Sequence, residues 1–176
     1  MIALRMSMFC TTLLFLMGHD ILVPEVSLLT ITIRTATEAD LPAVLAMSNA
    51  LIAENSCNGL VPDDLDYLRG YHIHLAEADG QPIGYAYGEA AVSSRNIGSC
   101  RKGDRFYDLE MVYVKPEYRS CGAGKQLFAA QQEYARSLGL ATLSLTAVNK
   151  DWKRLLHFYI DELGMDFFWA TLSMDL

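Results

Sequence analysis

Short stretches in which apolar and polar residues alternate are separated by stretches in which apolar residues recur every three or four positions. The alternation over 30–36 predicts a strand, and the helical spacing over 37–55 predicts an amphipathic helix. Thr37 followed by Asp40 forms an acidic variant of a capping box at the start of this helix. A second, shorter helix is predicted over 61–71, because a proline lies near its beginning and a glycine near its end.

Two further alternating stretches lie within 71–92 and flank the dipeptide Asp79-Gly80. This dipeptide is a strong signal for a tight turn, so we predict a β-hairpin. A polar loop with four basic residues follows over 93–105. Apolar residues occupy both faces of the next stretch, 106–114, which indicates a strand that is covered on both sides and therefore central.

The last third of the chain alternates between helical and strand-like patterns. We predict a helix over 122–140, a strand over 141–148, a helix over 149–164 and a final strand within 165–176. The complete order is β-α-α-β-β-β-α-β-α-β. This order predicts a mixed sheet with helices on its faces, in one α/β domain.

The first 29 residues differ from the rest because an apolar run follows the single basic residue Arg5. The run is shorter than the roughly 20 apolar residues of a membrane span, and no A-x-A cleavage pattern follows it. It has three interpretations: a weak membrane or export signal, a hydrophobic docking helix, or a leader created by an upstream start. We favour the last two and expect residues 1–29 to be an extension of a domain over 30–176.

The net charge and the spacing of cysteines and histidines limit which classes of function the sequence is compatible with. The chain has 176 residues, 52% of them hydrophobic, and a formal net charge of −7. This charge argues against a nucleic-acid partner and is compatible with a cationic small molecule. The four cysteines form no C-x-x-C pair and the four histidines complete no zinc pattern. We therefore expect reduced thiols in a cytoplasmic protein, no metal centre and no membrane partner.

A turn at 119–124 lies between the predicted central strand and the following helix and contains the sequence Gly-Ala-Gly. The first amides of a helix have no partner within the helix, and the helix dipole adds partial positive charge there. Glycine also lets a ligand approach the backbone closely. The turn is therefore a candidate anion site, and the alternative is a tight strand-to-helix turn without a ligand.

The frame V-x-P-x-x-R-x-x-G-x-G around this turn is formed by Val114, Pro116, Arg119, Gly122 and Gly124. It resembles motif A of the GNAT superfamily of acetyl-CoA-dependent N-acetyltransferases. The resemblance covers about 30–176, including the hairpin before the motif. It implies a single-domain, mostly antiparallel mixed sheet flanked by helices and splayed between its fourth and fifth strands.

A second, weaker part of the resemblance lies near the C-terminus, in the pattern N…FY…LG. Its residues are Asn149, Phe158, Tyr159, Leu163 and Gly164. The stretch from Asn149 to Tyr159 is longer than is usual in the family, so the role of one of these two residues is open.

The resemblance implies how acetyl-CoA is held. The backbone amides of Cys121, Gly122, Ala123, Gly124 and Lys125 would bind its pyrophosphate, with Arg119 nearby. The backbone of Val112 and Val114 would pair with the pantetheine arm, and the amide near Val112 would face the thioester oxygen. Asn149 would contact the pantetheine arm, and its alternative role is that of a helix N-cap.

Two side chains are implied in proton transfer. Glu110 lies two residues before Val112, on the same face of an ideal strand, and would be the general base. Its alternative is a buried ion pair. Tyr159 would protonate the leaving thiolate, and its alternative is core packing.

The resemblance implies an acetyltransferase acting on a primary amine, as a monomer or a homodimer. Four acidic residues between the first two helices favour a small cationic or aminoglycoside-like acceptor: Glu54, Asp63, Asp64 and Asp66. The alternatives are a protein lysine or N-terminal acetyltransferase and a non-catalytic acyl-CoA-binding module.

Overall fold

The computed structural model describes residues 29–57, 59–168 and 170. Two of its α-helices lie near the N-terminal end of this part, and two follow the last antiparallel strand. The elements are β1 (Ile31–Thr35), α1 (Leu41–Ala53), α2 (Leu65–Arg69), β2 (His74–Ala78), β3 (Gln81–Val92), β4 (Arg105–Val114), α3 (Ala123–Ser137), β5 (Leu143–Leu145) and α4 (Trp152–Leu156), which a π-helical turn (His157–Glu162) continues.

The strands form one sheet in the order β1-β2-β3-β4-β5, in which the first four are antiparallel to their neighbours and β5 runs parallel to β4. The two last strands pair only from Tyr107 with Leu143 to Leu109 with Leu145. Beyond this short ladder β4 continues to Val114 without a partner on that side. The predicted mixed sheet, splayed between its fourth and fifth strands, is confirmed.

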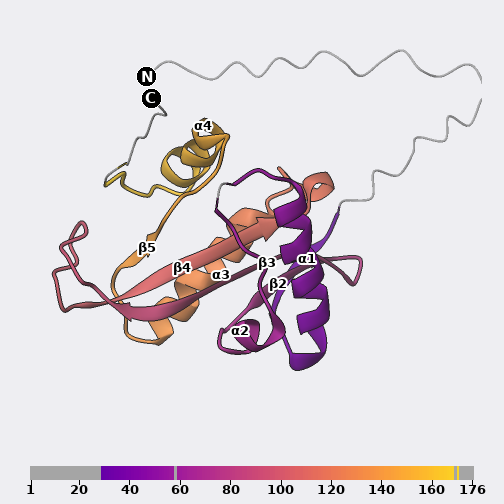
Figure 1. Cartoon of the computed structure of the whole chain (residues 1–176), viewed down its shortest axis with the longest axis horizontal. Helices are drawn as coiled ribbons and strands as arrows, with labels where there is room; N and C mark the ends of the chain where they lie inside the picture. Colours follow the sequence, from indigo (N-terminus) through magenta and orange to yellow (C-terminus); the bar gives the residue numbers. More distant parts are fainter. Residues whose placement is uncertain (1–28, 58, 169, 171–176) are drawn as a thin grey trace, which may run out of the picture.

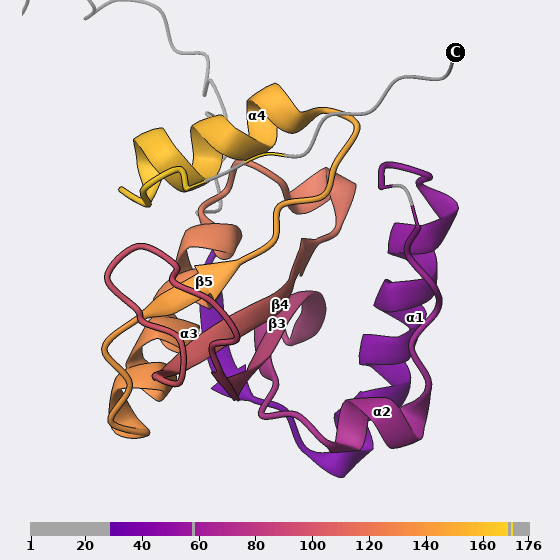
Figure 2. The ribbon, with the colours of Figure 1, turned by 60° about the vertical axis from the view of Figure 1, so that its left-hand side comes forward.

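Helices cover both faces of this sheet, with α1 and α3 on opposite sides (Figure 1, Figure 2). Successive side chains of a strand point to opposite faces, which divides the core into layers. On one face α1 packs through Val44 against Tyr85 and Tyr87. On the other face Leu127 and Phe128 of α3 pack against apolar residues of the strands. The predicted central, doubly covered strand is β4.

The hairpin between β2 and β3 is confirmed. Ala78 pairs with Gln81, so the loop has two residues. Asp79 and Gly80 both have positive φ angles, of 50° and 73°. Two positive φ angles in succession are typical of the type I′ turn that matches the twist of antiparallel strands.

A β-bulge interrupts β4 at Glu110. Tyr87 pairs with Met111 and Gly88 pairs with Leu109, so Glu110 has no partner on β3. A Cβ atom on residue 88 would lie 2.3 Å from the carbonyl oxygen of Asp108, and the close approach of the strands here therefore requires glycine. An extra residue shifts the alternation of side chains. The prediction that Glu110 shares a face with Val112 is accordingly wrong.

The C-terminal part differs most from the sequence prediction. The strand predicted over 141–148 is assigned only for Leu143–Leu145. The predicted continuous helix is α4 followed by a π-helical turn, which takes up more residues per turn than an α-helix. Residues 165–168 form no strand, and the remainder of the predicted last strand lies largely outside the described residues.

The apolar extension over 1–28 also lies outside the described residues. Within the part of the chain that the structure does describe, none of the helices has the length and apolar character needed to cross a membrane.

Candidate active site

The glycine turn places free backbone amides at the start of α3. Ser120 and Gly122 have φ angles of 67° and 90°, so the chain turns sharply before the helix begins at Ala123. The amide of Gln126 makes a first bond of the helix, 3.2 Å to the carbonyl of Gly122. The amides of 122–125 therefore have no acceptor within α3, and no side chain caps the described helix start.

The space around this turn is open. A Cβ atom added to Gly122 would meet nothing within 4 Å. Free amides, a helix dipole and open space together suit the phosphate groups of a ligand. The geometry fits the predicted pyrophosphate site at Cys121, Gly122, Ala123, Gly124 and Lys125.

The splayed part of β4 has backbone groups without a strand partner that suit an extended ligand, although the carbonyl of Val114 accepts a bond from Arg119. The amide of Lys115 donates to the carbonyl of Ile83 at 2.9 Å, which fixes the residues of β4 that bond to β3. In an antiparallel pair every second residue directs its N–H and C=O away from the partner strand. Those residues are Val112 and Val114, whose backbone groups face the gap left by β5. The pantetheine arm of coenzyme A, which contains two amides, matches such an edge.

Arg119 has a different environment from the one predicted. Its guanidinium pairs with both carboxylate oxygens of Glu54 at 2.8 and 2.7 Å, and its Nε donates to the carbonyl of Val114 at 2.9 Å. It also lies 5.8 Å from the ring centre of Tyr113, whose hydroxyl donates to Glu54. Arg119 therefore links the end of α1 to the open edge of β4, and its contact with a phosphate stays a prediction.

The C-terminal segment packs against the start of α3. Lys125 forms an ion pair of 2.8 Å with Glu162, and a Cβ on Gly124 would lie 3.3 Å from the ring of Phe158. Tyr159 packs on Phe128 and Phe158, with ring centres 6.3 and 5.1 Å away. Burial raises the pKa of Tyr159 to about 12, so its hydroxyl keeps its proton at neutral pH.

Asn149 does not cap the last helix, because Asp151 is the N-cap of α4. The side chain of Asn149 accepts a bond of 2.8 Å from the amide of Asp151 and lies 3.7 Å from the sulfur of Cys57. The thiol of Cys57 in turn donates to the carbonyl of Val148 at 2.8 Å. The segment around Asn149 is thus held against the loop after α1, beside the gap.

Glu110 is exposed rather than buried, so the predicted covered carboxylate is wrong. The bulge turns its side chain toward α2. There one carboxylate oxygen accepts a bond of 2.8 Å from the hydroxyl of Tyr67, and the other accepts one of 3.2 Å from Tyr71. Neither tyrosine was identified from the sequence. Their spacing of four residues beside a short helix, which brings side chains to one side, was the available signal.

Two more carboxylates lie beside Glu110. Glu89 pairs directly with Asp108 across β3 and β4. Burial first, and then the charges of Glu110 and Glu89, raise the pKa of Asp108. Within the described part of the chain neither Glu89 nor Asp108 forms an ion pair. Like charges directly opposite each other are unfavourable, and a cationic ligand would relieve this repulsion.

The acidic residues predicted to attract the acceptor have other partners. Glu54 pairs with Arg119, Asp64 caps α2 by accepting from the amide of Tyr67, and Asp66 pairs with Arg69. Asp63 accepts from Ser48 at 2.7 Å and from the hydroxyl of Tyr87 at 3.2 Å. Of the four, Asp63 alone accepts from a hydroxyl of the tyrosine cluster around Glu110, which consists of Tyr67, Tyr71 and Tyr87.

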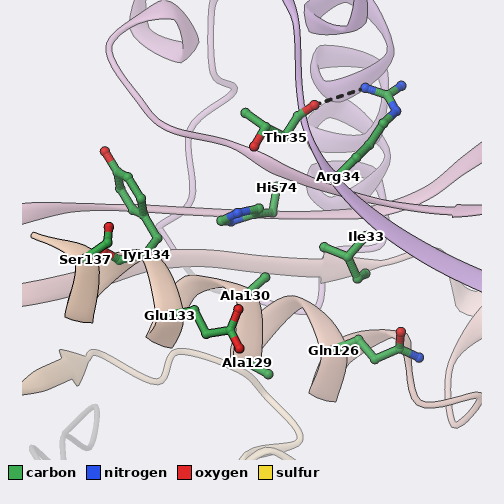
Figure 3. Close-up of a pocket in the computed structure, with 10 residues that line it drawn as sticks. All are labelled: Ile33, Arg34, Thr35, His74, Gln126, Ala129, Ala130, Glu133, Tyr134 and Ser137. Atoms are coloured by element: carbon green, nitrogen blue, oxygen red, sulfur yellow. Dashed lines mark hydrogen bonds between the residues drawn. The ribbon is translucent and has the colours of Figure 1, made fainter.

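A separate groove of about 620 Å³ lies between β1, β2 and α3 (Figure 3). It is lined by Ile33, Arg34, Thr35, His74, Gln126, Ala129, Ala130, Glu133, Tyr134 and Ser137. None of these is a predicted site residue. The groove is on the α3 side of the sheet, whereas Glu110 faces α2.

Comparison with known proteins connects this geometry to a family. A profile of the acetyltransferase (GNAT) family matches residues 46–165. The chain belongs to this family. It is 32% identical over 144 residues to the thialysine N-epsilon-acetyltransferase of Bos taurus, an alignment that covers 73% of this chain and 81% of the relative. As a member of the family the chain is an acyltransferase with acetyl-CoA as co-substrate.

Solved structures share the fold. The aminoglycoside N-acetyltransferase AAC(6')-Iy in complex with CoA has a TM-score of 0.64 at 20% identity, with 84% of this chain and 95% of that chain covered. A predicted acetyltransferase with acetyl-CoA from Clostridium acetobutylicum has a TM-score of 0.61 at 14% identity, with 83% and 96% covered. The aminoglycoside 6'-N-acetyltransferase AAC(6')-Ih from Acinetobacter baumannii has a TM-score of 0.63 at 19% identity, with 84% and 98% covered.

Proposed function

We propose that this protein transfers the acetyl group of acetyl-CoA directly to the primary amine of a small cationic molecule, with Glu110 as general base. The observation that carries the proposal is the bulge in β4. It turns the carboxylate of Glu110 toward an open, tyrosine-lined surface, two residues before the free backbone groups of Val112. A base at this position lies beside the strand edge that suits the thioester end of the co-substrate.

The surroundings of Glu110 support a cationic acceptor. Glu89, Asp108 and Glu110 place three carboxylates together, and Asp108 lacks an ion-pair partner within the described residues. Aromatic rings attract a cation through their electron-rich faces. Tyr67 and Tyr71 supply two such rings with centres 5.0 Å apart. Similar proteins are named as acetyltransferases of thialysine or of aminoglycosides, which agrees with an amine acceptor.

Each group has one role in the proposal. Acetyl-CoA supplies the activated acetyl group as a thioester. The amides at the start of α3 bind its pyrophosphate, and the backbone of Val112 and Val114 aligns its pantetheine arm. Glu110 removes a proton from the acceptor ammonium, which frees the nitrogen lone pair for attack. Tyr159 donates its proton to the departing thiolate, and its raised pKa keeps that proton available.

The test is a thiol-release assay on a panel of amines with the wild type, Glu110→Gln and Tyr159→Phe. We expect turnover with cationic small amines, a fall of about 10²–10⁴ in Glu110→Gln because the amide cannot accept the proton, and a lower kcat with unchanged acetyl-CoA affinity in Tyr159→Phe. Turnover on lysine peptides but not on small amines would contradict the acceptor class. Full activity of Glu110→Gln would contradict the base.

A further inference from the structure

Two phenol hydroxyl groups converge on the carboxylate of Glu110 from one short helix and the residues after it. Tyr67 belongs to α2, and Tyr71 lies two residues beyond the end of this helix. The hydroxyl of Tyr67 lies 2.8 Å from Oε2 of Glu110, and the hydroxyl of Tyr71 lies 3.2 Å from Oε1. The two hydroxyls are 2.9 Å apart. Each carboxylate oxygen therefore has its own phenol.

The rings are fixed by packing. Tyr71 packs on Tyr87 of β3 with ring centres 4.6 Å apart, and Tyr67 packs on Tyr71. Leu68, between them in sequence, is fully buried, and Asp64 caps the helix. These contacts restrict both rings beside Glu110, Tyr71 more than Tyr67, which is 43% exposed. The pair is consequently preorganised around the carboxylate.

The number of protons limits how the three groups bond. Each phenol has a single proton, whereas a carboxylate only accepts. The proton of Tyr67 goes to Glu110, and the proton of Tyr71 goes either to the oxygen of Tyr67 or to Oε1 of Glu110. Burial is the main cause that raises the pKa of both phenols, so both stay protonated at neutral pH. Tyr71 is thus a reserve donor, which bonds to Glu110 fully when Tyr67 is absent.

Other neighbours of Glu110 repel its carboxylate, whereas the two phenols form hydrogen bonds with it. Asp108 on β4 and Glu89 on β3 face this surface and are both acidic, and a third carboxylate, Asp63, accepts from the hydroxyl of Tyr87 behind the two rings. Like charges repel the carboxylate of Glu110, whereas a hydrogen bond from a phenol holds it toward α2.

We propose that Tyr67 and Tyr71 are positioning residues that hold the carboxylate of Glu110 in a fixed orientation, and that each substitutes in part for the other. The inference rests on the role of Glu110 as base. It predicts redundancy, because the loss of one phenol leaves a donor in place and the loss of both leaves none.

The experiment is a double-mutant cycle with Tyr67→Phe, Tyr71→Phe and the double variant. Phe keeps the ring packing and removes only the hydroxyl. We expect each single variant to lower kcat/KM by about twofold or less and the double variant to lower it by about tenfold or more, whereas two independent effects would multiply to about fourfold. The loss in the double variant should lie in kcat, while KM for the amine and the melting temperature stay close to the wild-type values.

Tyr134→Phe is the matched control. This tyrosine lies on α3, on the other side of the sheet, and lines the groove of Figure 3. Its variant should retain the wild-type kcat. A merely structural role of Tyr67 and Tyr71 predicts a lower melting temperature that accompanies the loss of activity.

The outcomes separate this inference from the proposed function. If Glu110→Gln is inactive and the double variant has the wild-type kcat, the positioning role is wrong and the base remains. If the effects of the two single variants simply add up to that of the double variant, the redundancy is wrong. If Glu110→Gln is fully active, the base is wrong, and the positioning role is wrong with it.

Discussion

Single residues at the turn before α3 combine a backbone requirement with a chemical one. Gly122 has a φ angle of 90°, in the left-handed region that glycine adopts without steric cost. It is also the N-cap of α3, where a side chain with an oxygen would normally satisfy a free amide. The absence of such a side chain leaves these amides available to a ligand.

Replacement of Gly122 by aspartate should remove co-substrate binding. The new carboxylate would enter the anion site, so we expect the affinity for CoA to fall at least about 100-fold in calorimetry. Gly139→Asp is the control, since Gly139 has a similar φ angle of 74° beyond the other end of α3. Both variants should lose about 1–2 kcal/mol of stability from the left-handed backbone. Unchanged CoA affinity in folded Gly122→Asp protein would refute the site.

At the scale of elements, the bulge in β4 decides which way the site residues face. The extra residue Glu110 places Met111 and Tyr113 with the core on the α1 side, and Val112 with the apolar residues on the α3 side. The alternation read from the sequence assumed a regular strand. A bulge depends on how two strands approach each other, and here the approach is allowed by Gly88 on the partner strand.

A methyl group on residue 88 should disturb this approach. In Gly88→Ala the added Cβ would clash with the carbonyl of Asp108, so we expect a loss of about 2–3 kcal/mol in chemical denaturation and a further drop in kcat/KM as Glu110 moves. In Gly103→Ala the Cβ would meet nothing within 4 Å, and only the cost of a φ angle of 95° applies. Equal stability of the two variants, with full activity of Gly88→Ala, would show that the bulge tolerates a side chain.

At the scale of the whole molecule, buried titratable groups couple stability to pH. Nδ1 of His74 is buried without a hydrogen-bond partner in the described part of the chain, at the groove between β2 and α3. Burial, with a smaller effect of the neighbouring His72, lowers the pKa of His74 to about 4. The unfolded chain, with an ordinary pKa near 6.5, therefore binds more protons than the folded chain between these values.

The sign of the effect follows from this difference. Stability contributed by neutral His74 is complete above about pH 6.5 and is lost as the pH falls toward about 4. His74→Phe should therefore unfold with a melting temperature that changes less between these pH values than that of the wild type. The same slope in His74→Phe and wild type would show that His74 does not cause the acid sensitivity.

Patterns of neighbouring residues determined much of the fold. The hairpin at Asp79-Gly80, the helix after Thr37 and the glycine turn before α3 follow from local backbone preferences, which adjacent residues specify almost alone. The resemblance of motif A then identified the family. The candidate pyrophosphate site could also be located from the sequence, because all its amides belong to one turn.

Only the tertiary structure decided what lies around these elements. Tyr67 and Glu110 are 43 positions apart and meet because α2 packs beside a bulged strand, and Glu54 meets Arg119 across 65 positions. Three further features depend on pairing and packing with distant segments: the bulge at Glu110 in β4, the short β5 and the π-helical turn before Gly164. Such contacts are set by the global balance of burial and hydrogen bonding, which the periodicity of a single stretch does not contain.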